Sequence, residues 1–163
     1  MTDPEPLIRW FESLSPETLD ELPRFYAADA EFKDPFNEVR GVESIKHIFR
    51  HMFSQVAEPR FAVGSRFHGD DGVMLLWDFH FRTRAPLPPR AMTARGATHL
   101  RFDADGKVIL HRDYWDAAEE ILAGFASGGF EMHFPRRFTR WLKLLRLLPY
   151  PAYFALVRRF TKL

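Results

Sequence analysis

The sequence predicts an α+β fold in which a curved antiparallel sheet wraps, as a cone, around N-terminal helices. Two observations carry this prediction. Apolar residues recur at helical spacing up to about residue 57, and from residue 61 the period changes to two. Helical segments followed by a run of strands are typical of α+β folds, with the helices packed on one face of the sheet. The chain has 163 residues, 46% of them apolar and 17 of them Phe, which is enough for a substantial core.

The first part of the chain predicts three helices and one short strand. Residues 7–14 form a short helix with one apolar stripe. Ser15 and Pro16 are typical of a second helix start, as N-cap and first helical residue, and this helix is expected to run to about Ala27. A short strand is expected at 31–33. Gly41 then opens a long helix over 42–57, whose apolar face includes Ile45, Ile48, Phe49, Met52, Phe53 and Val56.

The middle of the chain predicts an antiparallel meander of about four strands. Alternating segments cover 61–67, 73–83, 92–102 and 108–115. Gly69-Asp70-Asp71-Gly72 and Asp103-Ala104-Asp105-Gly106 are turn signals between them. A helix over 119–125 continues from the last strand.

The C-terminal part differs in charge from the rest. From His133 onward there are eight basic residues and no acidic ones. We therefore expect two parts, a cone domain over 1–120 and a basic amphipathic helical extension over 121–163, with helices at 136–148 and 152–161. Two interpretations of the extension stay open. Residues 136–162 contact an anionic membrane surface, or their apolar face covers the cone or an interface.

Composition also excludes several classes. The chain contains no Cys, which removes disulfides and thiolate chemistry, and no run of 18 apolar residues predicts a spanning helix. The acidic N-terminus is unlike a secretory signal, so a cytoplasmic location is expected. There is no Gly-rich phosphate loop, so we expect no cofactor. A His-x-Asp pair is a weak metal signal, so we expect no metal, and basic residues before the extension alternate with acids, so we expect no nucleic acid.

Asp34 is the first candidate for chemistry. It lies in Asp34-Pro35-Phe36, at a junction between predicted elements with aromatic neighbours. Burial there raises the pKa of a carboxyl group and makes it a usable general base. The alternative is a turn, because Asp before Pro commonly accepts hydrogen bonds from nearby backbone N–H groups.

Two strands carry further ionisable residues. In 108–115, alternation places His111, Asp113 and Trp115 on one face, and period two alone does not say which face points inward. In 73–83, the pattern by itself favours burial of Trp77, Phe79 and Phe81, which leaves Asp78 and His80 in solvent.

Two segments carry a resemblance to a known family. FYAADAEFKDPFNEVRGVESIKHIFRHMF (25–53) and HLRFDADGKVILHRDYWDAAEE (99–120) resemble the nuclear transport factor 2-like (cystatin-like) superfamily, in its SnoaL-like branch, over roughly residues 5–120. The resemblance implies a cone with an interior pocket for a small-molecule ligand, and a homodimer formed through the open face of the sheet. The superfamily includes ketosteroid isomerases, polyketide cyclases, epoxide hydrolases, dehydratases and non-catalytic binding domains, so fold alone does not select a function.

Comparison with ketosteroid isomerase separates the site positions. Asp34 resembles that family's general base, and Tyr26 a supporting tyrosine. The positions that resemble its oxyanion-hole Tyr and protonated Asp hold Trp10 and Thr98, and a second supporting Tyr is replaced by Phe49. Since neither Trp nor Thr matches a phenol and a protonated acid, steroid isomerisation by that mechanism is not expected.

The resemblance also orients the sheet. Thr98 and Trp115 match pocket-facing positions, which implies that His111 and Asp113 face inward and tilts Asp78 and His80 the same way. We therefore expect acid/base catalysis by Asp34, His111 and Asp113 on a small apolar substrate, as an isomerase, cyclase or hydrolase. The alternative is a non-catalytic binding domain. The residues expected to line the pocket are Trp10, Tyr26, Phe49, Phe53, Asp78, His80, Thr98 and Trp115.

Overall fold

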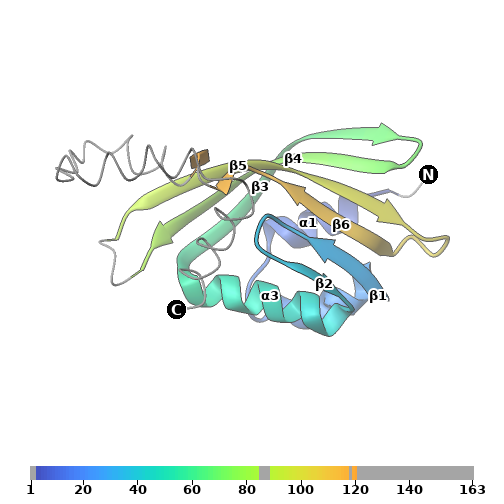
Figure 1. Cartoon of the computed structure of the whole chain (residues 1–163), viewed down its shortest axis with the longest axis horizontal. Helices are drawn as coiled ribbons and strands as arrows, with labels where there is room; N and C mark the ends of the chain where they lie inside the picture. Colours follow the sequence, from blue (N-terminus) through green and yellow to red (C-terminus); the bar gives the residue numbers. More distant parts are fainter. Residues whose placement is uncertain (1–2, 85–88, 118, 121–163) are drawn as a thin grey trace, which may run out of the picture. The chain divides into compact units, whose positions relative to one another are not determined.

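A computed structural model describes residues 3–84, 89–117 and 119–120 (Figure 1). The chain divides into two compact units, Met1–Gly128 and Gly129–Leu163, and all described residues belong to the first. The helices predicted at 136–148 and 152–161 lie outside the described residues, and so does most of the helix predicted at 119–125. The membrane contact predicted for 136–162 therefore stays a prediction. Among the described residues, no helix is both long and apolar enough to cross a membrane.

The order of elements in the first unit confirms the predicted α+β class. Short helical segments come first, a two-stranded hairpin and a long helix follow, and a four-stranded meander ends the unit. The elements are α1 (Glu5–Glu12), the 3-10 turn η1 (Thr18–Glu21), α2 (Leu22–Phe25), β1 (Tyr26–Lys33), β2 (Glu38–Arg40), α3 (Val42–Gln55), β3 (Val56–Gly69), β4 (Gly72–Thr83), β5 (Ala91–Phe102) and β6 (Val108–Tyr114).

The six strands form one sheet in the order β2-β1-β6-β5-β4-β3. Strands β3 to β6 pair antiparallel, as predicted, but β1 and β6 run parallel, with Phe32 beside His111. The sheet is therefore mixed and not fully antiparallel. A short hairpin can join only antiparallel strands, whereas parallel neighbours need a long connection between them. Here α3 and the strands β3 to β5 form that connection, and β6 returns beside β1 in the same direction. This pairing brings the buried Phe32 of β1 next to His111 of β6.

The helix predicted from Ser15 to Ala27 is the main local error. The chain forms only η1 and the four-residue α2, and it is extended from Tyr26 onward. Ser15 does begin a turn, since its Oγ accepts a hydrogen bond from the Thr18 N–H at 3.3 Å. Pro23 has no N–H to continue a helical ladder, and Tyr26, Ala30 and Phe32 are buried as alternating residues of β1. Packing of this strand overrides the helical preference of its alanines.

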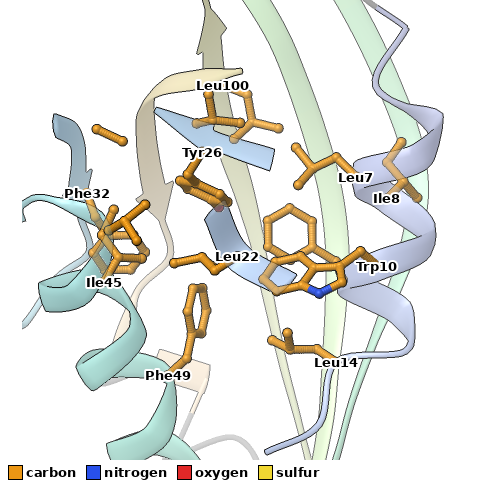
Figure 2. Packing of buried hydrophobic residues seen from close by; sticks show 14 of the residues in the cluster. Leu7, Ile8, Trp10, Leu14, Leu22, Tyr26, Phe32, Ile45, Phe49 and Leu100 are labelled. Carbon is orange, nitrogen blue, oxygen red and sulfur yellow. The ribbon is translucent and has the colours of Figure 1, made fainter. Parts of the chain in front are cut away.

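The core lies between the helices and one face of the curved sheet (Figure 1). Figure 2 shows apolar side chains of α1, β1 and α3 meeting in one cluster, in which Tyr26 lies near the centre. The predicted stripes of α1 and α3 supply much of it, and β4, β5 and β6 add Leu75, Leu100 and Val108. Each such side chain stabilises the fold by about 1.5–3 kcal/mol relative to exposure. We call the covered face of the sheet the inner face and the opposite one the outer face.

Candidate functional site: a buried hydrogen-bonded chain beside a small cavity

Strand register brings the polar residues of the inner face together. Thr98 of β5 lies opposite Asp113 of β6, and Leu100 lies opposite His111. Since side chains two residues apart share a face, these residues all point toward the helices. His111 is only 3% exposed, and the Asp113 side chain is 17% exposed. The structure thus places the predicted His111, Asp113 and Thr98 side by side on the inner face.

Five side chains on this face form one continuous hydrogen-bonded chain. The Tyr26 hydroxyl lies 2.6 Å from His111 Nδ1, and His111 Nε2 lies 2.9 Å from Asp113 Oδ1. The Thr98 hydroxyl donates to the same Oδ1. Trp77 Nε1 in turn donates to Thr98 Oγ1 at 2.7 Å. These residues come from β1, β4, β5 and β6, so only the folded sheet assembles them.

Donor and acceptor chemistry fixes the direction of each bond. An indole N–H only donates, so Thr98 accepts from Trp77 and gives its single proton to Asp113. Burial, and then the negative charge of Asp113, raise the pKa of Tyr26 well above its usual 10.0, so its hydroxyl keeps its proton. Among the described residues this proton has one acceptor, His111 Nδ1. With Tyr26 as the donor to Nδ1, the matching tautomer of His111 carries its proton on Nε2 and donates it to Asp113.

This arrangement gives His111 and Asp113 different roles. Both ring nitrogens of His111 are engaged, and Phe11, Phe32 and Phe49 surround the ring at centroid distances of 5.6, 4.8 and 6.4 Å. His111 therefore orients Asp113 and offers no unengaged nitrogen. On Asp113, Oδ1 accepts both bonds, and Oδ2 has no hydrogen-bond donor within the described part of the chain. Oδ2 is therefore the oxygen of Asp113 that can still accept a hydrogen bond or a proton.

A small cavity lies beside this hydrogen-bonded chain of side chains. Its volume is about 30 Å³, which is room for about one water molecule. The wall is mostly apolar and aromatic, with polar groups from only a few residues. It is lined by Phe11, Phe49, Phe61, Val63, Leu75, Trp77, Thr98, His111 and Asp113. An apolar cavity with a few convergent polar groups is the usual form of a small-molecule site.

A larger hollow lies elsewhere on the surface. It is an open groove of about 500 Å³ beside the start of α3, where Gly41, Glu43 and Ser44 meet Lys107. Lys107 Nζ already donates to the Pro23 carbonyl at 2.6 Å. Tyr26 also borders this groove, but its hydroxyl bonds to His111. Since the other groups of the hydrogen-bonded chain are absent from its lining, we place the candidate site at the smaller interior cavity.

Asp34 does not line the interior cavity. It begins the turn after β1, where its carboxylate accepts hydrogen bonds from the Phe36 N–H at 2.7 Å, from the Asn37 N–H, and from Asn37 Nδ2 at 2.9 Å. The structure thus shows the turn that was the alternative at this position. Burial nevertheless raises the pKa of Asp34 above its usual 3.8, and the charge of Asp113 adds to this effect. Asp34 is therefore electrostatically linked to the site, while Asp113 is the carboxylate at the cavity wall.

The remaining predicted pocket residues separate into three groups. Phe49 and Thr98 line the cavity, and Tyr26 reaches it through His111. Trp10 is a core residue whose Nε1 donates to the Thr18 carbonyl at 3.1 Å. Two aromatic residues lie at the margins: Phe53 packs against the core, and Trp115 contacts Phe36 edge-on at 5.6 Å.

The inward orientation expected for Asp78 and His80 is wrong. These residues pair with Arg95 and Thr93 on the outer face, and His80 Nδ1 lies 2.9 Å from Thr93 Oγ1. The neighbouring residues Trp77, Phe79 and Phe81 occupy the inner side, where Phe79 stacks on Phe61 at 4.4 Å and on Phe81 at 5.1 Å. Three large aromatic side chains outweigh two polar ones in choosing the buried face.

The site also contains residues outside the predicted set, chiefly Trp77, Phe11 and Phe61. For Trp77 the signal was present, because alternation in 73–83 already favoured its burial. For Phe61 no local signal pointed to the cavity, since its place depends on the pairing of β3 with β4. Among the described residues, no three potential ligands are grouped so as to hold a metal ion.

The fold and the cavity together define a nuclear transport factor 2-like cone domain, and comparison with known proteins agrees. The sequence model of the SnoaL-like domain family matches residues 7–111. The chain therefore belongs to this family. No protein with a curated description matches the sequence.

Solved structures from several bacteria have the same fold. A putative SnoaL-like polyketide cyclase from Shewanella putrefaciens is 18% identical, with 78% of this chain and 99% of that chain covered and a TM-score of 0.64. A hypothetical protein with a ketosteroid isomerase-like fold from Catenulispora acidiphila, in complex with trimethylamine, is 20% identical (76% and 93% covered, TM-score 0.61). An epoxide hydrolase of the LEH-like type from M. tuberculosis is 18% identical (76% and 89% covered, TM-score 0.57). At these identities the likeness establishes the fold alone.

Proposed function

We propose that this protein binds a small, largely apolar molecule at the interior cavity and carries out acid/base chemistry on it, with Asp113 as the proton acceptor. One observation carries the proposal. A chain of four hydrogen bonds holds a single carboxylate at the wall of an otherwise apolar cavity and leaves its Oδ2 unengaged. A base must be within hydrogen-bond reach of the proton it removes, and a carboxylate held at the cavity wall is suited to reach a molecule bound there.

The chemistry follows from the charges on the chain. When Asp113 accepts a proton at Oδ2, the His111 Nε2–H and the Thr98 hydroxyl remain bonded to Oδ1 and keep the group in place. Asp34 is a second carboxyl group, and its raised pKa lets it hold a proton at higher pH than an ordinary Asp. Carboxyl groups in different environments are a common source of paired acid and base roles. Isomerase, cyclase and hydrolase reactions all use such transfers, and structures with this fold include a polyketide cyclase and an epoxide hydrolase by name.

The test is turnover by two matched variants. Small apolar ketones, enones and epoxides are screened with the wild-type protein, and any active substrate is then given to Asp113→Asn and Asp78→Asn. We expect Asp113→Asn to lose turnover by about 10²-fold or more while still binding the substrate, because a general base contributes about 10²–10⁴-fold. Asp78 lies on the outer face, so Asp78→Asn is expected to keep wild-type activity. Equal turnover by both variants and the wild type would contradict the assignment.

A second function, binding without catalysis, is favoured by the small size of the cavity. A volume of about 30 Å³ is far below that of an ordinary ligand pocket, and most polar groups at its edge already bond to one another. A satisfied internal network of this kind also stabilises a fold. Metabolites that co-purify from the native host and are recovered unchanged after prolonged incubation with the protein would favour this function over catalysis.

A further inference from the structure

We propose that the side chain of Trp77 occupies the ligand position. The ligand would be a planar aromatic molecule with an N–H or O–H donor, which replaces the indole ring between Gly96 and Thr98. The inference rests on the proposed function only in placing the ligand site at the interior cavity. It adds the chemical class of the ligand and the residue that must move to admit it.

The indole of Trp77 fills a space of defined shape. Trp77 of β4 lies opposite Gly96 of β5. A Cβ atom at Gly96 would overlap the ring atoms Cη2 and Cζ2 of Trp77, so the ring lies directly against the backbone of β5. On another side, Phe61 contacts the ring edge-on at 5.9 Å and 82°. The space is therefore flat, bounded by a glycine, and suited to an aromatic ring.

Trp77 is packed more loosely than Trp10. Trp10 is 4% exposed, belongs to the hydrophobic core, and contacts the rings of Phe11, Phe25 and Phe49. Trp77 is only half-buried and is not part of the hydrophobic cluster that the described residues form. Rotation of Trp77 away from Gly96 therefore leaves the core intact, whereas removal of Trp10 does not.

The space that the indole fills has one polar end. Nε1 of Trp77 donates to Thr98 Oγ1 at 2.7 Å, and Thr98 donates onward to Asp113. A ligand N–H or O–H in the same place satisfies Thr98 in the same way and stands next to the carboxylate. The remaining cavity of about 30 Å³ admits only about one water molecule, so a ring-sized ligand enters only when a side chain leaves. Phe61 has no polar group that a ligand donor would replace.

The test begins with Trp77→Ala and indole. We expect indole to bind this variant with one-to-one stoichiometry in calorimetry and to raise its melting temperature. 1-Methylindole has nearly the same shape without the donor and is expected to bind about tenfold more weakly, because it has no N–H to donate to Thr98 Oγ1. In Trp77→Ala/Thr98→Val the two probes are expected to bind alike, and in Trp77→Ala/Gly96→Ala neither is expected to bind. Absence of indole binding to Trp77→Ala, or equal binding of the two probes, would overturn the proposal.

A second measurement needs no cavity-forming variant. Wild-type protein labelled with 5-fluorotryptophan is titrated with indole and followed by ¹⁹F NMR, with the Trp77 signal assigned from Trp77→Phe. We expect the Trp77 signal to shift saturably while the Trp10 signal stays constant. An unchanged Trp77 signal up to the solubility limit of indole would show that the side chain is not displaced. Indole binding without turnover of any substrate would contradict only the catalytic role of Asp113. Loss of turnover in Asp113→Asn without indole binding to Trp77→Ala would contradict only this inference.

Discussion

Two pairs of one His and one Asp, each two residues apart on a strand, lie on opposite faces of the sheet. His111 and Asp113, two residues apart on β6, are on the inner face and bond to each other and to Tyr26 and Thr98. Asp78 and His80, two residues apart on β4, are on the outer face, where His80 bonds to Thr93. The polar residues alone therefore do not determine which face is buried.

The residues that alternate with each pair along its strand account for the difference. On β4 they are Trp77, Phe79 and Phe81, whose burial stabilises the fold more than burial of the polar pair would. On β6 the alternate residues include Arg112 and Tyr114, and the Arg112 guanidinium lies over the Tyr114 ring at 4.9 Å on the outer face. A His-x-Asp pair is thus buried only where its neighbours have less to gain from burial and where other strands supply hydrogen-bond partners.

The largest expected effect distinguishes Asp113 from Asp78. Asp113→Ala leaves the His111 Nε2–H and the Thr98 hydroxyl without their acceptor in a buried site, which is expected to lower the free energy of unfolding by about 3 kcal/mol. Asp78→Ala changes a residue of the outer face and is expected to stay within about 0.5 kcal/mol of wild type. Urea unfolding of both variants measures the difference, and similar losses would contradict the comparison of the two faces.

The next effect concerns the tyrosine at the other end of the chain. Tyr26→Phe removes the donor to His111 Nδ1 and is expected to cost about 1–2 kcal/mol in unfolding free energy. In the wild type, ¹⁵N NMR of the His111 ring is expected to show the proton on Nε2, and this preference is expected to weaken in Tyr26→Phe. Tyr114→Phe on the outer face serves as the control, since Tyr114 is 46% exposed. A wild-type ring with its proton on Nδ1 would refute the assigned bond directions.

Asp34 is expected to give a smaller, pH-dependent effect. Its pKa in the folded protein lies above 3.8, so the native state binds this proton more readily than the unfolded chain. The contribution of Asp34 to stability therefore rises as the pH falls through its native pKa and declines as the pH rises through it. Asp34→Asn lacks this titration, so the difference in unfolding free energy between wild type and variant should shift in favour of wild type from about pH 7 to about pH 4. A difference that is constant with pH, or of opposite slope, would contradict the raised pKa.

The smallest effect on stability is expected on the outer face. Phe67, Leu76 and Tyr114 are exposed there, at 57%, 43% and 46%. Leu76→Lys is expected to change the unfolding free energy by less than about 0.5 kcal/mol. If the homodimer predicted through this face forms, the same substitution should convert dimer to monomer in light scattering. A dimer that is unaffected by Leu76→Lys would place the interface elsewhere.

Much of the fold was predictable because it depends on local patterns. The stripe of α3 and the alternation of β4 to β6 are each visible in a few consecutive residues. The first strand was underestimated because Ala27 to Ala30 carry no strand signal of their own, and they lie in the register shift between the paired residues Tyr26 and Glu31. The inner face was assigned correctly to His111 and Asp113 through the family resemblance, and the same resemblance misplaced Asp78 and His80.

Periodicity and turn signals were enough to predict the α+β class, the meander and the shared face of His111 and Asp113, whereas Thr98 was assigned to that face through the family resemblance. Periodicity and turn signals are local properties of the sequence. Long-range packing was needed to show that Tyr26 bonds to His111 and that Trp77 lies on Gly96 and bonds to Thr98. The structure also showed that the Asp34 carboxylate accepts a hydrogen bond from the Phe36 N–H. The bonds of Tyr26 and Trp77 join residues 85 and 21 positions apart. Contacts at such separation depend on strand register, which is fixed only when the whole inner face packs against the helices.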